Sequence, residues 1–131
     1  MKDGEKKHYM LIINGKLSNL NDYITACRTN QYKGAEMKAS NENRVKVEIY
    51  RQLGRLRIQR PVYMRYRWYE PNRRRDLDNI SSFGRKVIQD ALVKTHVLQN
   101  DGWNEIIGFR DDFYIDKENP RVEVEIEEVW N

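Results

Sequence analysis

The sequence predicts a single α+β domain, a mixed β-sheet with helices packed on one face. The length of 131 residues suits one domain with one core. Apolar residues repeat with helical spacing in three segments, and they alternate or cluster as in strands in four others. The resulting order, β-α-α-β-α-β-β, is that of one mixed sheet with its helices on one side. The polar, lysine-rich residues 1–7 are expected to be flexible.

The first half of the chain is predicted to hold one short strand and two helices. A buried strand covers 9–13. Ser18 or Asn19 can cap a helix that runs through Cys27. A longer helix is expected over 35–53, and Gly54 is a plausible stop signal just after it.

The second half is predicted to contain three strands and one helix. The segment 57–69 is rich in aromatic and β-branched residues, as is typical of strands. The alternation places Val62, Met64, Tyr66 and Trp68 on one face of this strand and Tyr63, Arg65, Arg67 and Tyr69 on the other, as suits nucleic acid or an ordinary solvent-facing strand. A helix from Asn79 or Ile80 to Thr95 follows. Strands near 105–114 and 121–129 are then expected to pair as an antiparallel hairpin, and the alternation in the last one places Val122, Val124 and Ile126 inward.

Composition narrows the environment of the protein. Charged residues make up 34% and hydrophobic residues 39%, as in a water-soluble globular protein. No apolar run reaches the length of a membrane span. Cys27 is the only cysteine, so an intrachain disulfide is excluded; a buried structural thiol in a reducing cytoplasm is expected. The sequence has no glycine-rich phosphate loop, so no nucleotide cofactor is expected.

The charges are strongly segregated along the chain. Residues 55–75 contain eight arginines and one acid, whereas residues 101–131 contain ten acids and three bases. An arginine stripe is the usual signature of a phosphate-binding surface. Arginine stems that cover an ordinary solvent-facing strand would produce the same pattern, so charge alone leaves both interpretations open.

Three aspartates form the candidate metal site. If the segment is extended, the carboxylates of Asp76 and Asp78 project to one side while Leu77 points into the core. Asp101 follows the next helix, where the chain can return beside them. Converging carboxylates repel one another, and a divalent cation such as Mg²⁺ commonly offsets that repulsion. The alternative is structural: Asp78 or Asn79 would cap a helix, and Asp101 would lie in an ordinary turn.

The string Arg73-Arg74-Arg75-Asp76-Leu77-Asp78-Asn79, followed by Asp90-Ala91-Leu92 and Asn100-Asp101, resembles the signature of the RusA family of Holliday-junction resolvases. The segment 17–23, with its Leu-Asn-x-Tyr core, also resembles the N-terminal part of that family. The resemblance implies a RusA-like fold and a small, homodimeric, Mg²⁺-dependent endonuclease, in which Mn²⁺ can replace Mg²⁺. It also implies a role in DNA recombination and repair; such enzymes are common in prophages.

The resemblance implies that Asp76, Asp78 and Asp101 bind the metal and are catalytic. The family's catalytic lysine normally lies one helical turn after the second aspartate, where this sequence has Ser82. Lys86 is the candidate replacement, because it stands four residues before Asp90, as the family lysine does before its equivalent. A four-residue insertion would reconcile both spacings. Arg85 is the alternate cation, and an exposed structural lysine is the alternative for Lys86. The predicted DNA-binding residues are Arg65, Arg67, Arg73, Arg74, Arg75 and Arg85.

The expected partners are four-way or branched DNA and a second copy of the chain, with no membrane. Two symmetric nicks need two active sites, so the reaction implies a two-fold dimer. The apolar residues at 106, 107, 109 and 113 exceed what one hairpin face can bury, which indicates that strand as the interface. Two other functions stay open: a non-catalytic protein that binds branched DNA, and a related nuclease that acts on flaps or RNA.

Overall fold

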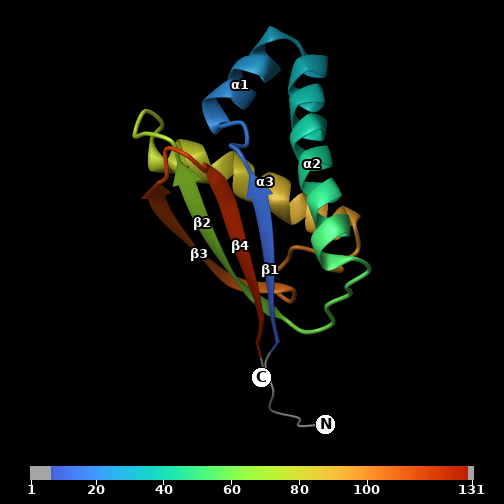
Figure 1. The fold of residues 1–131 in the computed structure, drawn as a ribbon. Helices are drawn as coiled ribbons and strands as arrows, with labels where there is room; N and C mark the ends of the chain where they lie inside the picture. The colour runs from blue at the N-terminus through green and yellow to red at the C-terminus, as the bar shows by residue number, and fades with distance from the viewer. Residues whose placement is uncertain (1–6, 130–131) are drawn as a thin grey trace, which may run out of the picture.

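The computed structural model describes residues 7–129 (Figure 1). Its elements are β1 (His8–Asn14), α1 (Leu20–Thr29), α2 (Gln31–Leu53), β2 (Val62–Glu70), α3 (Leu77–Lys94), β3 (Ile106–Ile115) and β4 (Arg121–Glu128). This order confirms the predicted one. The expected flexible segment lies outside the described residues except for Lys7, whose carbonyl accepts a hydrogen bond from the Glu128 N–H. No helix in the described range is both long and apolar enough to cross a membrane.

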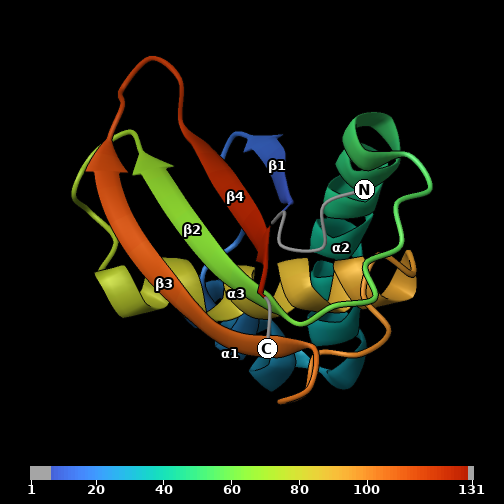
Figure 2. The same cartoon turned by 90° about the horizontal axis from the view of Figure 1, so that it is seen from below.

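The four strands form one mixed sheet in the order β1-β4-β2-β3. β4 lies antiparallel between β1 and β2, whereas β3 pairs with β2 in parallel. The predicted hairpin of the last two strands is therefore wrong, because β2 lies between them. β2, α3 and β3 instead form a crossover unit, and its helix returns the chain so that the two strands run in the same direction. β3 is left as an edge strand (Figure 2).

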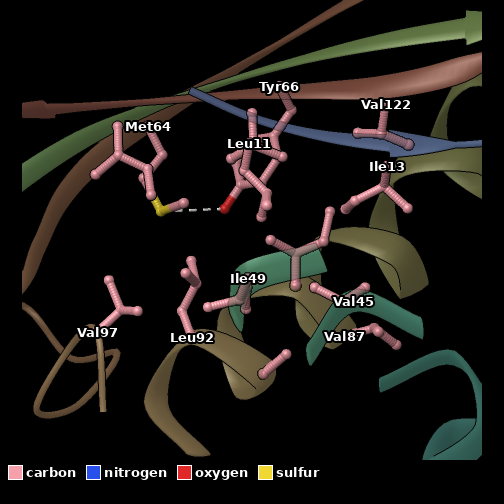
Figure 3. Packing of buried hydrophobic residues seen from close by; sticks show 14 of the residues in the cluster. Leu11, Ile13, Val45, Ile49, Met64, Tyr66, Val87, Leu92, Val97 and Val122 are labelled. Atoms are coloured by element: carbon pink, nitrogen blue, oxygen red, sulfur yellow. Dashed lines mark hydrogen bonds between the residues drawn. The ribbon is translucent and has the colours of Figure 1, made fainter. Parts of the chain in front are cut away.

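All three helices lie on one side of the sheet, as predicted (Figures 1 and 2). The inward residues predicted for β2 and β4 are buried between the sheet and the helices. Figure 3 shows this core, in which Tyr66 donates a hydrogen bond to the sulfur of Met64. α3 crosses the sheet closely, because Gly84 has no side chain and the indole of Trp68 occupies that space. The other sheet face is not covered by helices.

Local hydrogen bonds set the element ends. Asn19 caps α1 by accepting from the Asp22 N–H, and α1 continues past Cys27. The Asn30 side chain caps α2 at Gln31, four residues before the predicted start. Gly54 ends α2 with a positive φ of 61°, as expected from its sequence position.

Two further expectations are wrong. The second predicted strand begins at Val62 and not at residue 57, because the chain before Pro61 is irregular and Ile58 donates its N–H to the Val97 carbonyl instead. Cys27 is exposed, so it is not the buried structural thiol that was expected.

Candidate active site

Asp76 and Asp78 lie at the entrance of α3. The helix begins at Leu77, two to three residues earlier than predicted, and Asp76 occupies its N-cap position. Leu77 is 58% exposed and does not point into the core, so the predicted extended geometry of this segment is wrong. The entrance of a helix is nonetheless a favourable place for negative charge, because unpaired N–H groups and the helix dipole face it.

Neither aspartate is used as a helix cap. The Asp76 side chain accepts no capping hydrogen bond, and within residues 7–129 neither its carboxylate nor that of Asp78 has a hydrogen-bond or ion-pair partner. Asn79 does not cap the helix either, since its side-chain oxygen accepts from the Asn21 N–H of α1. The structural alternative therefore does not account for these two carboxylates. Their oxygens are available to a ligand.

The contact with α1 fixes the position of this entrance. Besides the Asn21–Asn79 hydrogen bond, Tyr23 of α1 stacks on Phe83 of α3 with ring centroids 4.6 Å apart. Asn21 and Tyr23 both belong to the Leu-Asn-x-Tyr segment that resembles the N-terminal part of the RusA family. The role of that segment in this structure is to brace the helix that carries the aspartates.

Lys86 lies beside Asp101. Its Nζ is 3.4 Å from Asp101 Oδ2 and 3.1 Å from Asp90 Oδ1. Lys38 of α2 contacts the other oxygen of Asp90 at 2.9 Å. The hydrogen bond to Asp90 is the main reason that the pKa of Lys86 is raised, and Asp101 adds to it. Lys86 is therefore held as a cation next to the predicted catalytic acid.

Arg85, the alternate cation, faces the other way. Its guanidinium pairs with Asp111 of β3 and lies over the ring of Phe109, 4.4 Å from the centroid. The Trp68 indole donates a second hydrogen bond to Asp111, at 2.9 Å. Since Asp111 holds Arg85, Lys86 is the better placed of the two cations to act at Asp101.

The three predicted metal ligands are not assembled within one chain. In the described part of the chain, one group of three potential ligand residues has its atoms within 4.8 Å of one another, and it does not contain Asp76, Asp78 or Asp101. Eight residues separate Asp78 from Lys86, or about 12 Å along the helix axis. Asp101 thus lies towards the middle of α3, whereas Asp76 and Asp78 lie at its start.

The group that does meet this criterion is His8, Glu125 and Glu127, on the open face of the sheet. Arg67 pairs with Glu125 at 2.8 Å, so a cation already occupies one of the three potential ligands. The group lies across the sheet from α3. It is distinct from the predicted site.

The predicted DNA-binding arginines fall into two groups. Arg73 and Arg74 are exposed at the entrance of α3 and have no ion pair with any described residue. They lie next to a cleft of about 570 Å³ whose lining includes Arg73 and Asp76. The remaining four are engaged within the protein: Arg65 near the Tyr63 ring, Arg67 with Glu125, Arg75 with Glu70, and Arg85 with Asp111.

The contribution of α2 to this ion-pair network was not predicted from the sequence. Lys38 and Glu42 of α2 extend the ion-pair network at Asp90, because Lys38 also lies 3.8 Å from Glu42 and Lys94 pairs with Glu42. The four-residue spacing of Lys86 and Asp90 indicates an ion pair on one helix face. Nothing local points to Lys38, since its partner is more than fifty residues away in the chain.

A comparison with protein families finds a match over residues 3–127 to the model described as Endodeoxyribonuclease RusA. The matched range includes every residue of the candidate site and nearly the whole chain. A search of the curated proteins yields no match that would add to this result.

Proposed function

The chain belongs to the RusA endodeoxyribonuclease family, and on that premise we propose that it is a Mg²⁺-dependent, structure-selective endonuclease that resolves Holliday junctions. It would do so by paired symmetric hydrolysis of two phosphodiester bonds, in DNA recombination and repair. One observation carries the proposal: within residues 7–129 the carboxylates of Asp76 and Asp78 have no hydrogen-bond or ion-pair partner, and they adjoin Arg73 and Arg74, which have no ion pair in the same range.

The residues at the α3 entrance suit a hard divalent cation. Mg²⁺ prefers oxygen ligands and keeps several waters, and two exposed carboxylates without a hydrogen bond to any described residue meet that need. Asp76 and Asp78 would hold the ion; Asp101, which lies beside Lys86 towards the middle of α3, would join them as the third carboxylate through a rearrangement on metal or DNA binding. When bound, the ion would lower the pKa of a water and neutralise charge on the scissile phosphate.

Lys86 supplies positive charge at Asp101. Its raised pKa keeps it protonated at neutral pH, so it acts as a cation and not as a base. The salt bridges to Asp90 and Asp101 orient the ammonium group of Lys86. Asp90 is itself held in place by a second ion pair, with Lys38 of α2. A fixed cation next to the phosphate stabilises the charge that develops on its oxygens during hydrolysis.

Arg73 and Arg74 would bind phosphates on either side of the cleaved bond. Contacts to the DNA backbone fix orientation without reading sequence, which suits an enzyme that selects a branched shape. Because a four-way junction is nicked in two strands of like polarity, the active unit would be a two-fold dimer with one site in each chain.

The decisive experiment measures cleavage of a synthetic four-way junction in Mg²⁺. Asp78→Asn should lower the rate about 100-fold or more, while junction binding measured in Ca²⁺ stays within a few-fold of the wild type. Glu36→Gln is the matched control, because it removes one exposed negative charge on α2 that has no hydrogen bond or ion pair with any described residue. Cleavage by Asp78→Asn at the control rate would refute the mechanism.

A second function is favoured by one observation, the separation of Asp101 from the other two carboxylates in the single chain. It is a non-catalytic protein that binds branched DNA. Tight junction binding without nicking, at any Mg²⁺ or Mn²⁺ concentration, would establish it. Competition between junction, flap and RNA substrates in the same assay separates a resolvase from a related nuclease with another target.

A further inference from the structure

β3 has one edge that pairs with nothing in the described chain. It is the outermost strand of the sheet and is ten residues long (Figure 2). Phe109 is 46% exposed and Tyr114 43% exposed, and Ile107 and Ile115 are each 49% exposed. A long edge with apolar side chains is a ready template for another strand. We propose that β3 pairs antiparallel with β3 of a second copy, with Asp111 of each chain at the two-fold axis.

The backbone supports this pairing. Asp116, just after β3, donates its N–H to the Glu70 carbonyl of β2. Hydrogen-bonding groups alternate sides along a strand, so the even-numbered residues near this end face β2 and the odd-numbered residues face the free edge. Phe109, Asp111 and Phe113 therefore present their N–H and C=O groups outwards. In an antiparallel pair about a two-fold axis, Asp111 can exchange hydrogen bonds with its own copy.

The side chains match in this register and across both sheet faces. Arg110 lies opposite the partner's Asp112, and the symmetry repeats that pair on the other side of the axis. Phe109 lies opposite the partner's Phe113, so two aromatic pairs flank the axis on the helix side. Opposite charges and aromatic side chains directly across two strands are the pairs that stabilise a sheet.

Charges in the middle of an edge strand usually prevent strand addition. Here the central acid is already compensated within its own chain, since Asp111 accepts from the Trp68 indole and pairs with Arg85. Two Arg85–Asp111 pairs would thus meet at the axis in place of two bare carboxylates. Arg110 and Asp112 are complementary across the axis.

Neighbouring registers lose this match. A shift of two residues in one direction places Arg110 opposite the partner's Arg110, and the opposite shift places Asp112 opposite the partner's Asp112. Like charges directly across two strands are destabilising. Shifts by one residue would bring outward-facing backbone groups against inward-facing ones, which breaks the hydrogen-bond ladder. The proposed register is the one in this range that satisfies backbone and charge together.

Sedimentation equilibrium of the full chain, without DNA or metal, tests the interface. The wild type should dimerise, and Arg110→Asp or Asp112→Arg alone should each raise the dimer dissociation constant about tenfold or more. Each variant also breaks the 2.9 Å ion pair between Arg110 and Asp112 within the chain, so folding is checked by circular dichroism. Mixing the two variants is decisive, because their heterodimer restores both cross-strand pairs while the pairs within each chain stay broken.

A wild-type monomer at all concentrations overturns the proposal. So does a dimer whose dissociation constant is unchanged by both substitutions, or a mixture that gains no heterodimer. The register is tested separately in a Cys27→Ser background: a chain with Arg110→Cys and a differently tagged chain with Asp112→Cys should form a disulfide between them. Efficient cross-linking of Arg110→Cys to itself would indicate the shifted register instead.

This interface would serve the paired cleavage proposed above, and it rests on that function for its biological meaning. Its measurement needs neither a junction nor Mg²⁺. A failure of strand pairing and a failure of nuclease activity are therefore distinguishable.

Discussion

Replacing Arg75 with methionine should lower the free energy of unfolding, without a direct effect on the predicted metal ligands. Arg75 was predicted to bind DNA from its place in the arginine stripe. In the structure its Nε lies 3.1 Å from Glu70 Oε1, and its Nη1 donates to the Leu17 carbonyl at 3.1 Å. It thereby ties the end of β2 to the loop before α1. A direct role of Arg75 at a phosphate stays a prediction.

The size of the effect follows from burial. The side chains of Arg75 and Glu70 are 15% and 8% exposed, so removal of the arginine leaves a carboxylate with little access to water. Breaking a fully buried pair costs about 3–5 kcal/mol. The Nε is in ion-pair range but has no well-directed hydrogen bond, so we expect the lower limit, about 3 kcal/mol. Methionine keeps the apolar stem, which separates the loss of charge from a loss of packing.

Urea denaturation gives the measurement. A loss of about 3 kcal/mol corresponds to a midpoint about 1–2 M lower for a protein of this size. Glu70→Gln in the Arg75→Met background should recover most of the loss, because no charge is then left buried without a partner. An Arg75→Met variant within about 0.5 kcal/mol of the wild type, or a double variant as unstable as the single one, would show that the reasoning is wrong.

Three further predictions concern the contact with DNA, the packing of α3 against the sheet, and stability in acid. Arg74→Ala should weaken junction binding and reduce the slope of log affinity against log salt by about 0.9, with no change in unfolding free energy, as fluorescence anisotropy at several salt concentrations can show. Gly84→Ala should cost about 1–2 kcal/mol in urea denaturation, because the new Cβ would lie 2.8 Å from a buried indole. Gly102→Ala should be near neutral, because its new Cβ would lie an ordinary 3.5 Å from the Glu105 carboxylate. Burial of Asp90 acts to raise its pKa, but hydrogen bonds from two lysines outweigh burial and hold that pKa below its ordinary value. Its stabilising contribution is therefore present above the unfolded-state pKa and is lost as the pH falls through the lower folded-state value, so Asp90→Asn should flatten the acid limb of a plot of stability against pH.

The predicted fold was correct where the evidence is local. Period-two alternation identified the inward residues of β2 and β4, because the pattern reports directly which face of a strand is buried. The pairing of the last two strands was wrong because the five residues between them suggest a hairpin, whereas partner choice depends on the whole sheet. A strand, a helix and a strand over 62–115 also fit a parallel crossover unit, and local patterns do not distinguish the two arrangements.

In the candidate site, too, the features set by local sequence could be predicted and those set by distant contacts could not. The aspartates and Lys86 could be selected from local motifs, and Lys86 lies beside Asp101 as a displaced family lysine would. Their separation along α3 does not follow from an extended Asp-x-Asp segment, because the helix begins at Leu77, two to three residues earlier than predicted, and Asp78 is already part of it. The buried Arg75–Glu70 pair was invisible for another reason. An arginine in a basic run looks the same in sequence whether its partner is a phosphate or a carboxylate of the same chain.

The place of the lysine on α3 gives the last prediction. Residue 82, the family's usual lysine position, is a serine whose hydroxyl donates to the Asp78 carbonyl at 2.7 Å. α3 is continuous through this region, so the four extra residues add about one turn, which moves the lysine about 6 Å along the axis and rotates it by about 40°. That shift places its Nζ at Asp101.

Lys86→Met should therefore slow junction cleavage about 100-fold at unchanged binding, and Ser82→Lys in the Lys86→Met background should not restore the rate. A lysine at residue 82 starts about one turn nearer the helix entrance, away from the Asp101 carboxylate. Lys86→Arg, which keeps a cation at the same place, should retain more activity than the methionine variant. Single-turnover rates on one junction compare all four proteins. Full rescue by Ser82→Lys would show that the cation is needed at the Asp78 end of the site and that its contact with Asp101 is incidental.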